Sequence, residues 1–278
     1  MKGMLSVAKT VFGGNRVIHW PTYCFRAVVW QVRKSLGHIF TARLANGAAV
    51  RVYPASAYSG IFYTPAPEGN NMEFIRKHYM LADTFVDVGA NVGLFSASLF
   101  DCFQKIVCFE PAPSAFRALC ETSNLNPAVS CDLHNIGVGD TRGELIFENE
   151  PNFSTTSRFV AEQGPNTIQV PVDTLDNILG QRFSKIVMKI DVEGFEEKVF
   201  IGADALFSNH VVKLVMFERL GRTNLESVRT FLESRGYVLF RVTDWMSITT
   251  DDRAISEPLI NLFACPTDVF DSLSCAKE

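Results

Sequence analysis

The chain has 278 residues, 47% of them hydrophobic, and a formal net charge of −4. This length and apolar content allow one large domain with a well-filled core, the net acidity argues against nucleic-acid binding, and no apolar run is long enough for a membrane-spanning helix. The seven cysteines are odd in number and form no C-x-x-C pair, which argues against a disulfide framework or a zinc site and favours a reducing, cytoplasmic compartment.

Charge is unevenly distributed along the chain. No Asp or Glu precedes Glu68, and that stretch holds eight basic residues, so it carries +8 while the rest of the chain carries −12. Such asymmetry is typical of a segment that contacts an anionic partner. We expect residues 1–37 to serve location or assembly rather than chemistry, either by packing on the catalytic domain or on a second subunit, or by lying on a membrane surface.

The first predicted elements are a helix over Thr22–Leu36 and a β-hairpin over Ile39–Tyr53, whose apolar residues alternate around an Asn-Gly turn. A loop over Pro54–Asn71 and a short helix over Met72–Met80 follow. We therefore divide the chain into an N-terminal basic helical segment with a β-hairpin, residues 1–80, and a second domain, residues 81–278.

A buried strand, a glycine turn and a helix follow over Thr84–Phe95. The turn has the pattern D-x-G-x-N-x-G, with Asp87, Gly89, Asn91 and Gly93 at the fixed positions. Such a unit brings backbone close to a ligand and points helix N–H groups at it. A dinucleotide fold has G-x-G-x-x-G, whereas here a pyrophosphate would meet the Asn91 side chain. Asp87 suits a positively charged amino-acid moiety, as in S-adenosylmethionine. We expect a branched side chain at Gly93 to abolish donor binding with the fold retained.

The next two predicted strands end in polar residues. Ile106–Glu110 ends in a carboxylate about twenty residues after the first glycine, where an acid accepts hydrogen bonds from ribose hydroxyls. Val129–Ile136 carries His134 and Asn135 near its end. We predict that Asn135 hydrogen-bonds the base of the cofactor. His134 stays open between a general base, a neighbour of the adenine and a packed histidine.

The remaining pattern alternates between strands and helices. Strands are predicted over Gly143–Glu148, Asn166–Pro171, Lys185–Asp191, Val212–Glu218, Tyr237–Val242 and Leu259–Cys265, and helices over Leu94–Phe100, Ser114–Asn124, Gly194–Phe207 and Leu225–Arg235. Alternating strands and helices predict an α/β fold with a parallel sheet. The last two strands have no helix between them, which predicts one antiparallel member, and Thr243–Glu257 between them reads as a loop.

Acidic residues follow the strand over Lys185–Asp191. Strand periodicity puts Lys189 and Asp191 on one face, and a lysine in so apolar a strand is costly unless it meets a carboxylate. Because ligands of open α/β sheets bind at the carboxyl ends of the strands, Asp191, Glu193 and Glu218 should meet in one crevice. Helix capping is the plain alternative for Asp191 and Glu193. The three acids also suit a hard cation, but their spacing matches no firm ligand pattern, and we predict no metal.

Four stretches resemble the FkbM-type S-adenosylmethionine-dependent methyltransferases. They are VDVGANVGLFS from Val86, FEP at Phe109–Pro111, VPVDTLDNIL at Val170–Leu179 and KIDVEGFEEKVFIGA at Lys189–Ala203, and the resemblance runs from about Ala55 to Glu218. It implies a Rossmann-like seven-stranded methyltransferase sheet, mostly parallel with the last strand antiparallel, here with an N-terminal helix and hairpin extension. It also implies S-adenosylmethionine as cofactor, bound by Asp87, Gly89, Ala90, Asn91, Gly93, Glu110 and Pro111.

The resemblance implies O-methylation of a sugar, a glycan or a small secondary metabolite. A hydroxyl is a weak nucleophile, so a positioned base adds rate. We predict that Asp191 or Glu193 is this base and that Lys189 orients the pair. Two alternatives stay open: a methyltransferase for a protein or lipid-linked acceptor at a membrane surface, and a cofactor-binding protein without turnover. The expected partner is a small-molecule or glycan acceptor and no nucleic acid, in the cytoplasm or peripherally at the inner membrane surface.

Overall fold

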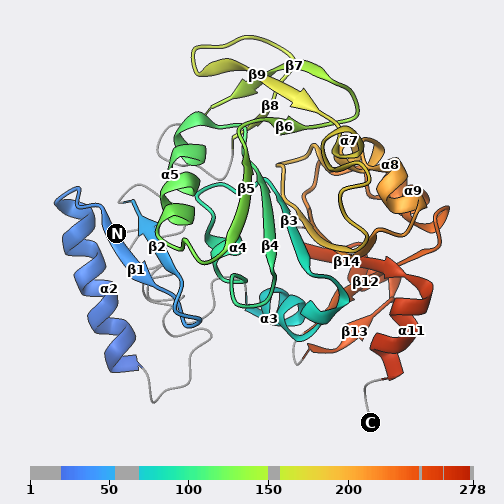
Figure 1. Cartoon of the computed structure of the whole chain (residues 1–278), viewed down its shortest axis with the longest axis horizontal. Helices are drawn as coiled ribbons and strands as arrows, with labels where there is room; N and C mark the ends of the chain where they lie inside the picture. The colour runs from blue at the N-terminus through green and yellow to red at the C-terminus, as the bar shows by residue number, and fades with distance from the viewer. Residues whose placement is uncertain (1–19, 54–68, 150–156, 244–245, 259, 276–278) are drawn as a thin grey trace.

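A computed structural model describes residues 20–53, 69–149, 157–243, 246–258 and 260–275 of the chain. Within these ranges eight strands form the main sheet, in the order β13-β12-β14-β11-β10-β3-β4-β5 (Figure 1). Their bounds are β3 (Thr84–Val88), β4 (Lys105–Phe109), β5 (Ser130–His134), β10 (Ile186–Ile190), β11 (Val212–Arg219), β12 (Tyr237–Val242), β13 (Ile248–Thr249) and β14 (Ile260–Pro266).

Strand directions confirm the α/β prediction. Strands β5, β4, β3, β10 and β11 are paired in parallel, and β14 pairs antiparallel with both β11 and β12. The seven long strands match the predicted seven, with one antiparallel member. The short edge strand β13 makes the eighth and lies in the segment Thr243–Glu257, which we predicted as a loop; α10 (Asp252–Ile255) lies there too.

Helices cover both faces of the main sheet. Along β3, Val86 and Val88 join a core formed with α7 (Glu196–Ile201), α8 (Asp204–Ser208) and α9 (Leu225–Glu233). Phe85 points to the other face. The helices α3 (Gly69–Lys77), α4 (Leu94–Ala97), α5 (Pro113–Asn124) and α11 (Thr267–Cys275) pack there. The two cores follow from the strand alternation, because successive side chains point to opposite faces of a sheet.

A second sheet lies beyond the carboxyl ends of the central strands (Figure 1). In the described chain it has the order β6-β9-β7-β8, with β6 (Gly137–Val138), β7 (Gly143–Glu148), β8 (Arg158–Phe159) and β9 (Thr167–Asp173). The predicted strand Gly143–Glu148 is confirmed at both ends, and the predicted Asn166–Pro171 is confirmed with its bounds shifted toward the C-terminus. Between β7 and β8, residues 150–156 lie outside the described ranges.

The predicted helix over Gly194–Phe207 was wrong in one respect, because two short helices, α7 and α8, take its place. A Cβ at Gly202 would lie 1.9 Å from the carbonyl oxygen of Gly139, so the chain passes backbone against backbone there. The carboxylate of Asp176, in the first turn of α6 (Leu175–Leu179), accepts hydrogen bonds from the amides of Ala205 and Leu206 and caps the second helix. Gly139 and Asp176, which make these contacts, are both distant in sequence from the helices.

The predicted N-terminal helix and hairpin are confirmed as α2 (Trp20–Ser35), β1 (Phe40–Arg43) and β2 (Ala49–Val52). Ala27 and Trp30 of the helix pack on the hairpin. Most of the predicted loop Pro54–Asn71 lies outside the described residues, and the predicted helix over Met72–Met80 appears as α3 followed by a 3₁₀ turn, η3 (Tyr79–Leu81). The division of the chain at residue 80 stays a prediction. Among the described helices, none is long and apolar enough to cross a bilayer.

Candidate active site

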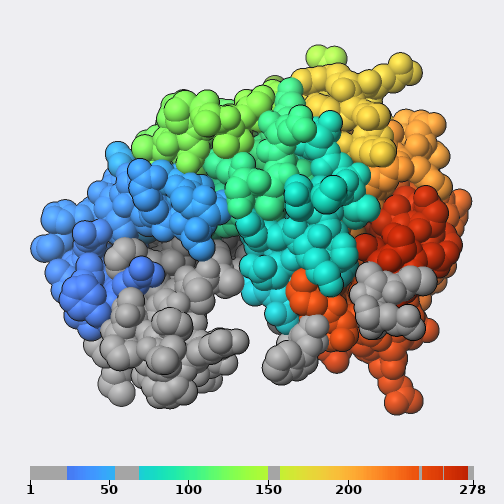
Figure 2. Space-filling model, turned by 60° about the horizontal axis from the view of Figure 1, so that its bottom comes forward, coloured from blue at the N-terminus to red at the C-terminus, as the bar shows by residue number. Residues whose placement is uncertain are grey.

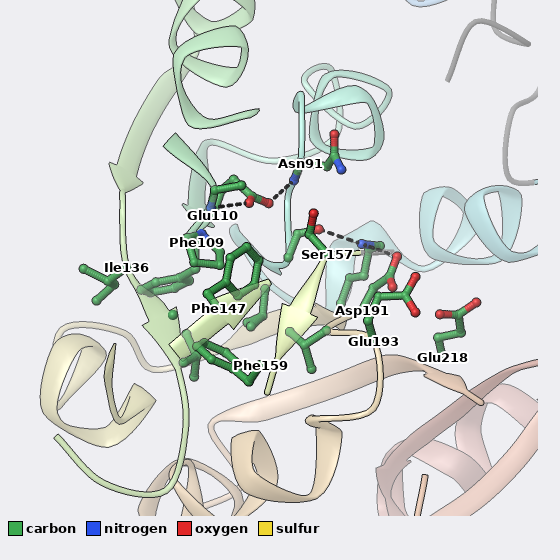
Figure 3. A pocket seen from close by; sticks show the side chains of 18 of the residues that line it. Asn91, Phe109, Glu110, Ile136, Phe147, Ser157, Phe159, Asp191, Glu193 and Glu218 are labelled. Carbon is green, nitrogen blue, oxygen red and sulfur yellow. Dashed lines mark hydrogen bonds and ion pairs between the residues drawn. The ribbon is translucent and has the colours of Figure 1, made fainter. Parts of the chain in front are cut away.

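A cavity of about 260 Å³ opens at the carboxyl ends of β3, β4, β10 and β11 (Figure 3). Of the predicted site residues, those that line it are Gly89, Asn91, Glu110, Pro111, Lys189, Asp191 and Glu193, and Glu218 lies with them. Ala90, Gly93, Asp87 and Asn135 are not among the described residues that line it. The structure therefore brings the glycine turn and the acidic stretch after β10 to one cavity, although some predicted residues do not line it.

Gly89 allows two strand ends to meet. It has φ +82°, and a Cβ there would lie 1.9 Å from the carbonyl oxygen of Asp191. Only glycine tolerates this approach. Gly93 is the N-cap of α4, with φ +80°, and a Cβ there would lie 2.6 Å from Cδ1 of Leu119. We interpret Gly93 as a packing residue, and its predicted role at the donor site stays a prediction.

Glu110 is buried at the end of β4 with its carboxylate at the cavity. The amides of Asn91 and Ala112 donate to its two oxygens at 2.7 and 2.8 Å. Burial raises the pKa of Glu110 to about 7, against the two amide hydrogen bonds, which lower it. Hydroxyl donors facing this carboxylate would favour its ionised form.

Asn135 and His134 lie next to the end of β4. The Asn135 side chain donates to the carbonyl oxygens of Glu110 and Pro111 at 2.8 and 3.2 Å. Its amide nitrogen therefore holds the end of β4, and the predicted contact of Asn135 with a cofactor base stays a prediction. His134 stacks on Phe109, with ring centroids 4.9 Å apart, and its Nε2 lies 3.1 Å from Asp132. Of the three alternatives for His134, the packed histidine describes it.

The opposite side of the cavity is apolar. Figure 3 shows Ile136, Phe147 and Phe159 gathered beside Phe109, away from Asp191, Glu193 and Glu218. Phe147 and Phe159 are in edge contact, with ring centroids 5.3 Å apart. These two rings come from β7 and β8 of the second sheet, and neither was predicted at the site from the sequence. A wall of this kind suits a flat heteroaromatic ring.

Lys189 lies buried under the polar half of the cavity. Its Nζ is 3.2 Å from Asp191 Oδ2, 3.4 Å from Asp87 Oδ1 and 3.4 Å from the Gly89 carbonyl oxygen. We predicted a carboxylate partner for Lys189, and two carboxylates, Asp87 and Asp191, pair with it. Asp87 is fully buried and also accepts a hydrogen bond from Ser96 Oγ at 2.6 Å. We correct its role accordingly: Asp87 positions Lys189 and does not face the cavity.

Arg222 restrains Glu193. Its Nε donates to the Glu193 carbonyl oxygen at 2.7 Å, and a second guanidinium nitrogen pairs with the Glu193 carboxylate. Glu193 has φ +54°, a left-handed conformation that is unusual for a side chain of this size. Arg222 was not predicted at the site from the sequence, because it lies in the loop after β11 and outside every motif.

Asp191, Glu193 and Glu218 form a cluster, with one oxygen of each within 4.8 Å of the others (Figure 3). Burial and the nearby Asp191 raise the pKa of Glu193. Burial and the same neighbour raise the pKa of Glu218 to about 8. The cluster has the oxygen ligands that a hard cation prefers, and Lys189 and Arg222 already place two positive charges on it.

Glu196 holds the turn between β10 and α7. Its carboxylate accepts from the Gly194 amide at 2.8 Å and from Thr223 Oγ1 at 2.9 Å, and the side chain is fully buried. The N-cap of α7 is Phe195, with no side-chain cap hydrogen bond, so neither Asp191 nor Glu193 takes the capping role that we considered. Asp191 and Glu193 keep their carboxylates at the cavity.

Comparison with known proteins relates this geometry to a family. Residues 87–239 match a family described as "Methyltransferase FkbM domain". "Methyltransferase 1" of Beauveria bassiana is 28% identical over 206 residues, which cover 62% of this chain and 81% of the relative. "Hexuronic acid methyltransferase AglP" of Haloferax volcanii is 31% identical over 121 residues, covering 43% and 49%. Among solved structures, a T. thermophilus 16S rRNA N2 G1207 methyltransferase in complex with AdoMet and guanosine matches with a TM-score of 0.43 at 12% identity, covering 82% and 50%.

Proposed function

The chain belongs to the FkbM methyltransferase family, and we propose that it transfers a methyl group from S-adenosylmethionine to a hydroxyl of a sugar, a glycan or a small secondary metabolite. One observation carries this proposal. One cavity is lined both by Glu110, whose carboxylate can accept hydrogen bonds from ribose hydroxyls, and by the restrained carboxylates of Asp191 and Glu193. The name of the Haloferax relative, a hexuronic acid methyltransferase, supports a glycan among the candidate acceptors.

The residues at the cavity fit S-adenosylmethionine. In its ionised form Glu110, with its oxygens held by two backbone amides, suits the ribose hydroxyls. The apolar wall at Phe147 and Phe159 suits the adenine ring. Asn91 in the middle of the turn disfavours the pyrophosphate of a dinucleotide. When bound, this donor supplies a methyl group on a positively charged sulfur.

The chain's own residues then align the acceptor and take its proton. Asp191 or Glu193 accepts the hydroxyl proton as the bond to carbon forms, which is the ordinary contribution of a general base. Lys189 pairs with Asp191 and holds its carboxylate in place, and Arg222 does the same for Glu193. The second sheet lines one side of the cavity and so helps to hold the reacting groups together.

The test uses S-adenosylmethionine with an isotope-labelled methyl group and a panel of uronic-acid oligosaccharides, neutral oligosaccharides and phenols. We expect label to appear in one acceptor class with release of S-adenosylhomocysteine, and we expect the new bond to be an ether that survives mild alkali. Label that is lost in alkali would identify a methyl ester on a carboxylate. Label found on nitrogen would identify an amine as the acceptor. Either result would contradict hydroxyl methylation.

A further inference from the structure

Helix α2 carries a stripe of exposed apolar side chains. Phe25, Val28, Val32 and Leu36, the last just beyond the helix end, are 69%, 63%, 53% and 61% exposed, and Ile39 continues the series at 53%. Their spacing of three or four residues puts them on one side of the helix. In the part of the chain that the structure describes, half of the large exposed apolar residues lie between positions 25 and 39.

The stripe points away from the molecule. Ala27 and Trp30, on the opposite side of α2, are buried against Val50 and Val52 of the hairpin. At 100° per residue the centre of the buried side and the centre of the stripe differ by about half a turn. Helix α2 and the hairpin form one flank of the molecule, far from α11 (Figures 1 and 2). A contiguous apolar surface on such a flank marks an interaction site.

Every charged residue of α2 and the hairpin is basic, and Arg51 of the hairpin pairs with Glu121 of α5. Residues 20–53 contain Arg26, Arg33, Lys34, Arg43 and Arg51 and no acidic residue. Arg26 and Arg33 are seven residues apart, so they follow one edge of the stripe. The guanidinium of Arg33 also lies over the Phe40 ring, 4.4 Å from its centroid, where β1 continues the flank. An apolar face bordered by cations is the signature of a helix that lies in a membrane interface.

We propose that this flank docks on an anionic lipid surface, with the α2 stripe at the boundary of headgroups and acyl chains and the cations on the headgroups. Self-association through the stripe would bring Arg26 and Arg33 of two copies together, and α2 has no acidic residue to pair them. The docking proposal does not depend on methyl transfer, because α2 and the hairpin are separate from the cavity lining.

The test is co-sedimentation of the full chain with vesicles of phosphatidylcholine alone and of phosphatidylcholine with phosphatidylglycerol. We expect binding to the anionic vesicles that weakens with salt, and little binding to the neutral ones. The double variant Val28→Glu/Val32→Glu should reduce binding at least about tenfold. The matched control is Leu145→Glu/Ile201→Glu, which changes two exposed apolar residues elsewhere and should bind as the original protein does. Thermal melts check that each variant is folded.

A second measurement keeps the proposal open to refutation if a variant fails to fold. In Phe25→Trp, brominated phosphatidylglycerol should quench the added fluorescence, because position 25 would meet the acyl chains. Absence of quenching together with equal sedimentation of both double variants would overturn the proposal. Self-association that Val28→Glu/Val32→Glu abolishes, without vesicle binding by the original protein, would instead assign the face to a second copy of the chain.

Discussion

At the scale of single residues, Glu193 shows how the site is held. A left-handed conformation costs a side-chain-bearing residue of order 1–2 kcal/mol, and Glu193 adopts it at φ +54°. Arg222 bonds both its carbonyl oxygen and its carboxylate. The position and the charge of Glu193 therefore depend on one arginine from a loop that follows β11.

Replacing Arg222 with alanine tests this dependence. Arg222 lowers the pKa of Glu193, while burial and Asp191 raise it. Removal of the guanidinium should therefore raise this pKa, so less Glu193 is ionised at neutral pH and the acid limb of the kcat profile moves to higher pH. We expect kcat near pH 7 to fall at least about tenfold, with S-adenosylhomocysteine affinity unchanged.

Arg142→Ala is the control for that profile, because Arg142 is 82% exposed and pairs loosely with Asp173 at 3.7 Å. Arg222→Lys should restore part of the rate, since it returns a positive charge without the two-pronged contact. An Arg222→Ala enzyme with the original pH profile would mean that ionisation of Glu193 does not govern turnover.

At the scale of elements, the central strands could be predicted because buried parallel strands are short apolar runs bounded by turns. Strand β7 has the predicted bounds, and β10 and β11 lie within a residue or so of theirs. The split between α7 and α8 could not be predicted, because it depends on the contact of Gly202 with Gly139. Local pattern says nothing about such distant backbone contacts.

The same distinction applies to the candidate site. Glu110, Asp191, Glu193 and Glu218 were predictable because they end strands that meet at one edge of the sheet. Three other residues could not be predicted: Arg222, which lies in a loop, and Phe147 and Phe159, which belong to the second sheet. The local sequence pattern does not indicate where that loop and that sheet are placed. Asp87 was predicted at the site, but the sequence does not reveal that Lys189 lies between it and the cavity.

The α4 N-terminus allows a test of what Gly93 does. Gly93→Val puts a branched side chain at φ +80° and its Cβ 2.6 Å from Leu119 Cδ1. A left-handed valine and a crowded contact should together cost about 2–4 kcal/mol of unfolding free energy. We expect a lower Tm and, in the protein that stays folded, S-adenosylhomocysteine affinity within a few-fold of the original.

Gly143→Val is the matched control, since a Cβ at Gly143 meets nothing within 4 Å and its φ is not left-handed. Its Tm should stay close to the original. If Gly93→Val melts like Gly143→Val and yet binds no S-adenosylhomocysteine, Gly93 contacts the donor and the packing interpretation is wrong.

At the scale of the whole molecule, the cavity is shared between two sheets. The main sheet supplies the carboxylates and Lys189, and the second sheet supplies the aromatic wall (Figure 3). Bringing donor and acceptor into one geometry is the main task in methyl transfer, and the two sheets together provide both halves of that geometry. The charged flank at α2 lies apart from this cavity, so docking and chemistry can be examined separately.

Methyl transfer, as we propose it, depends above all on the acids after β10. The most direct measurement is kcat, with S-adenosylhomocysteine affinity beside it, for Asp191→Asn and Glu193→Gln. Asp140→Asn serves as the control, because Asp140 pairs with the exposed Lys198 at 2.6 Å outside the cavity lining. Each assay is repeated after chelator treatment, which should change nothing because Lys189 pairs with Asp191 and Arg222 pairs with Glu193.

We expect at least one of the two variants to lose about a hundred- to ten-thousand-fold in kcat, the effect of a missing general base, while ligand affinity stays within a few-fold. Loss of turnover on chelation, restored by magnesium or calcium, would make the acids metal ligands instead. Near-normal kcat in both variants would contradict a role for either acid as the base.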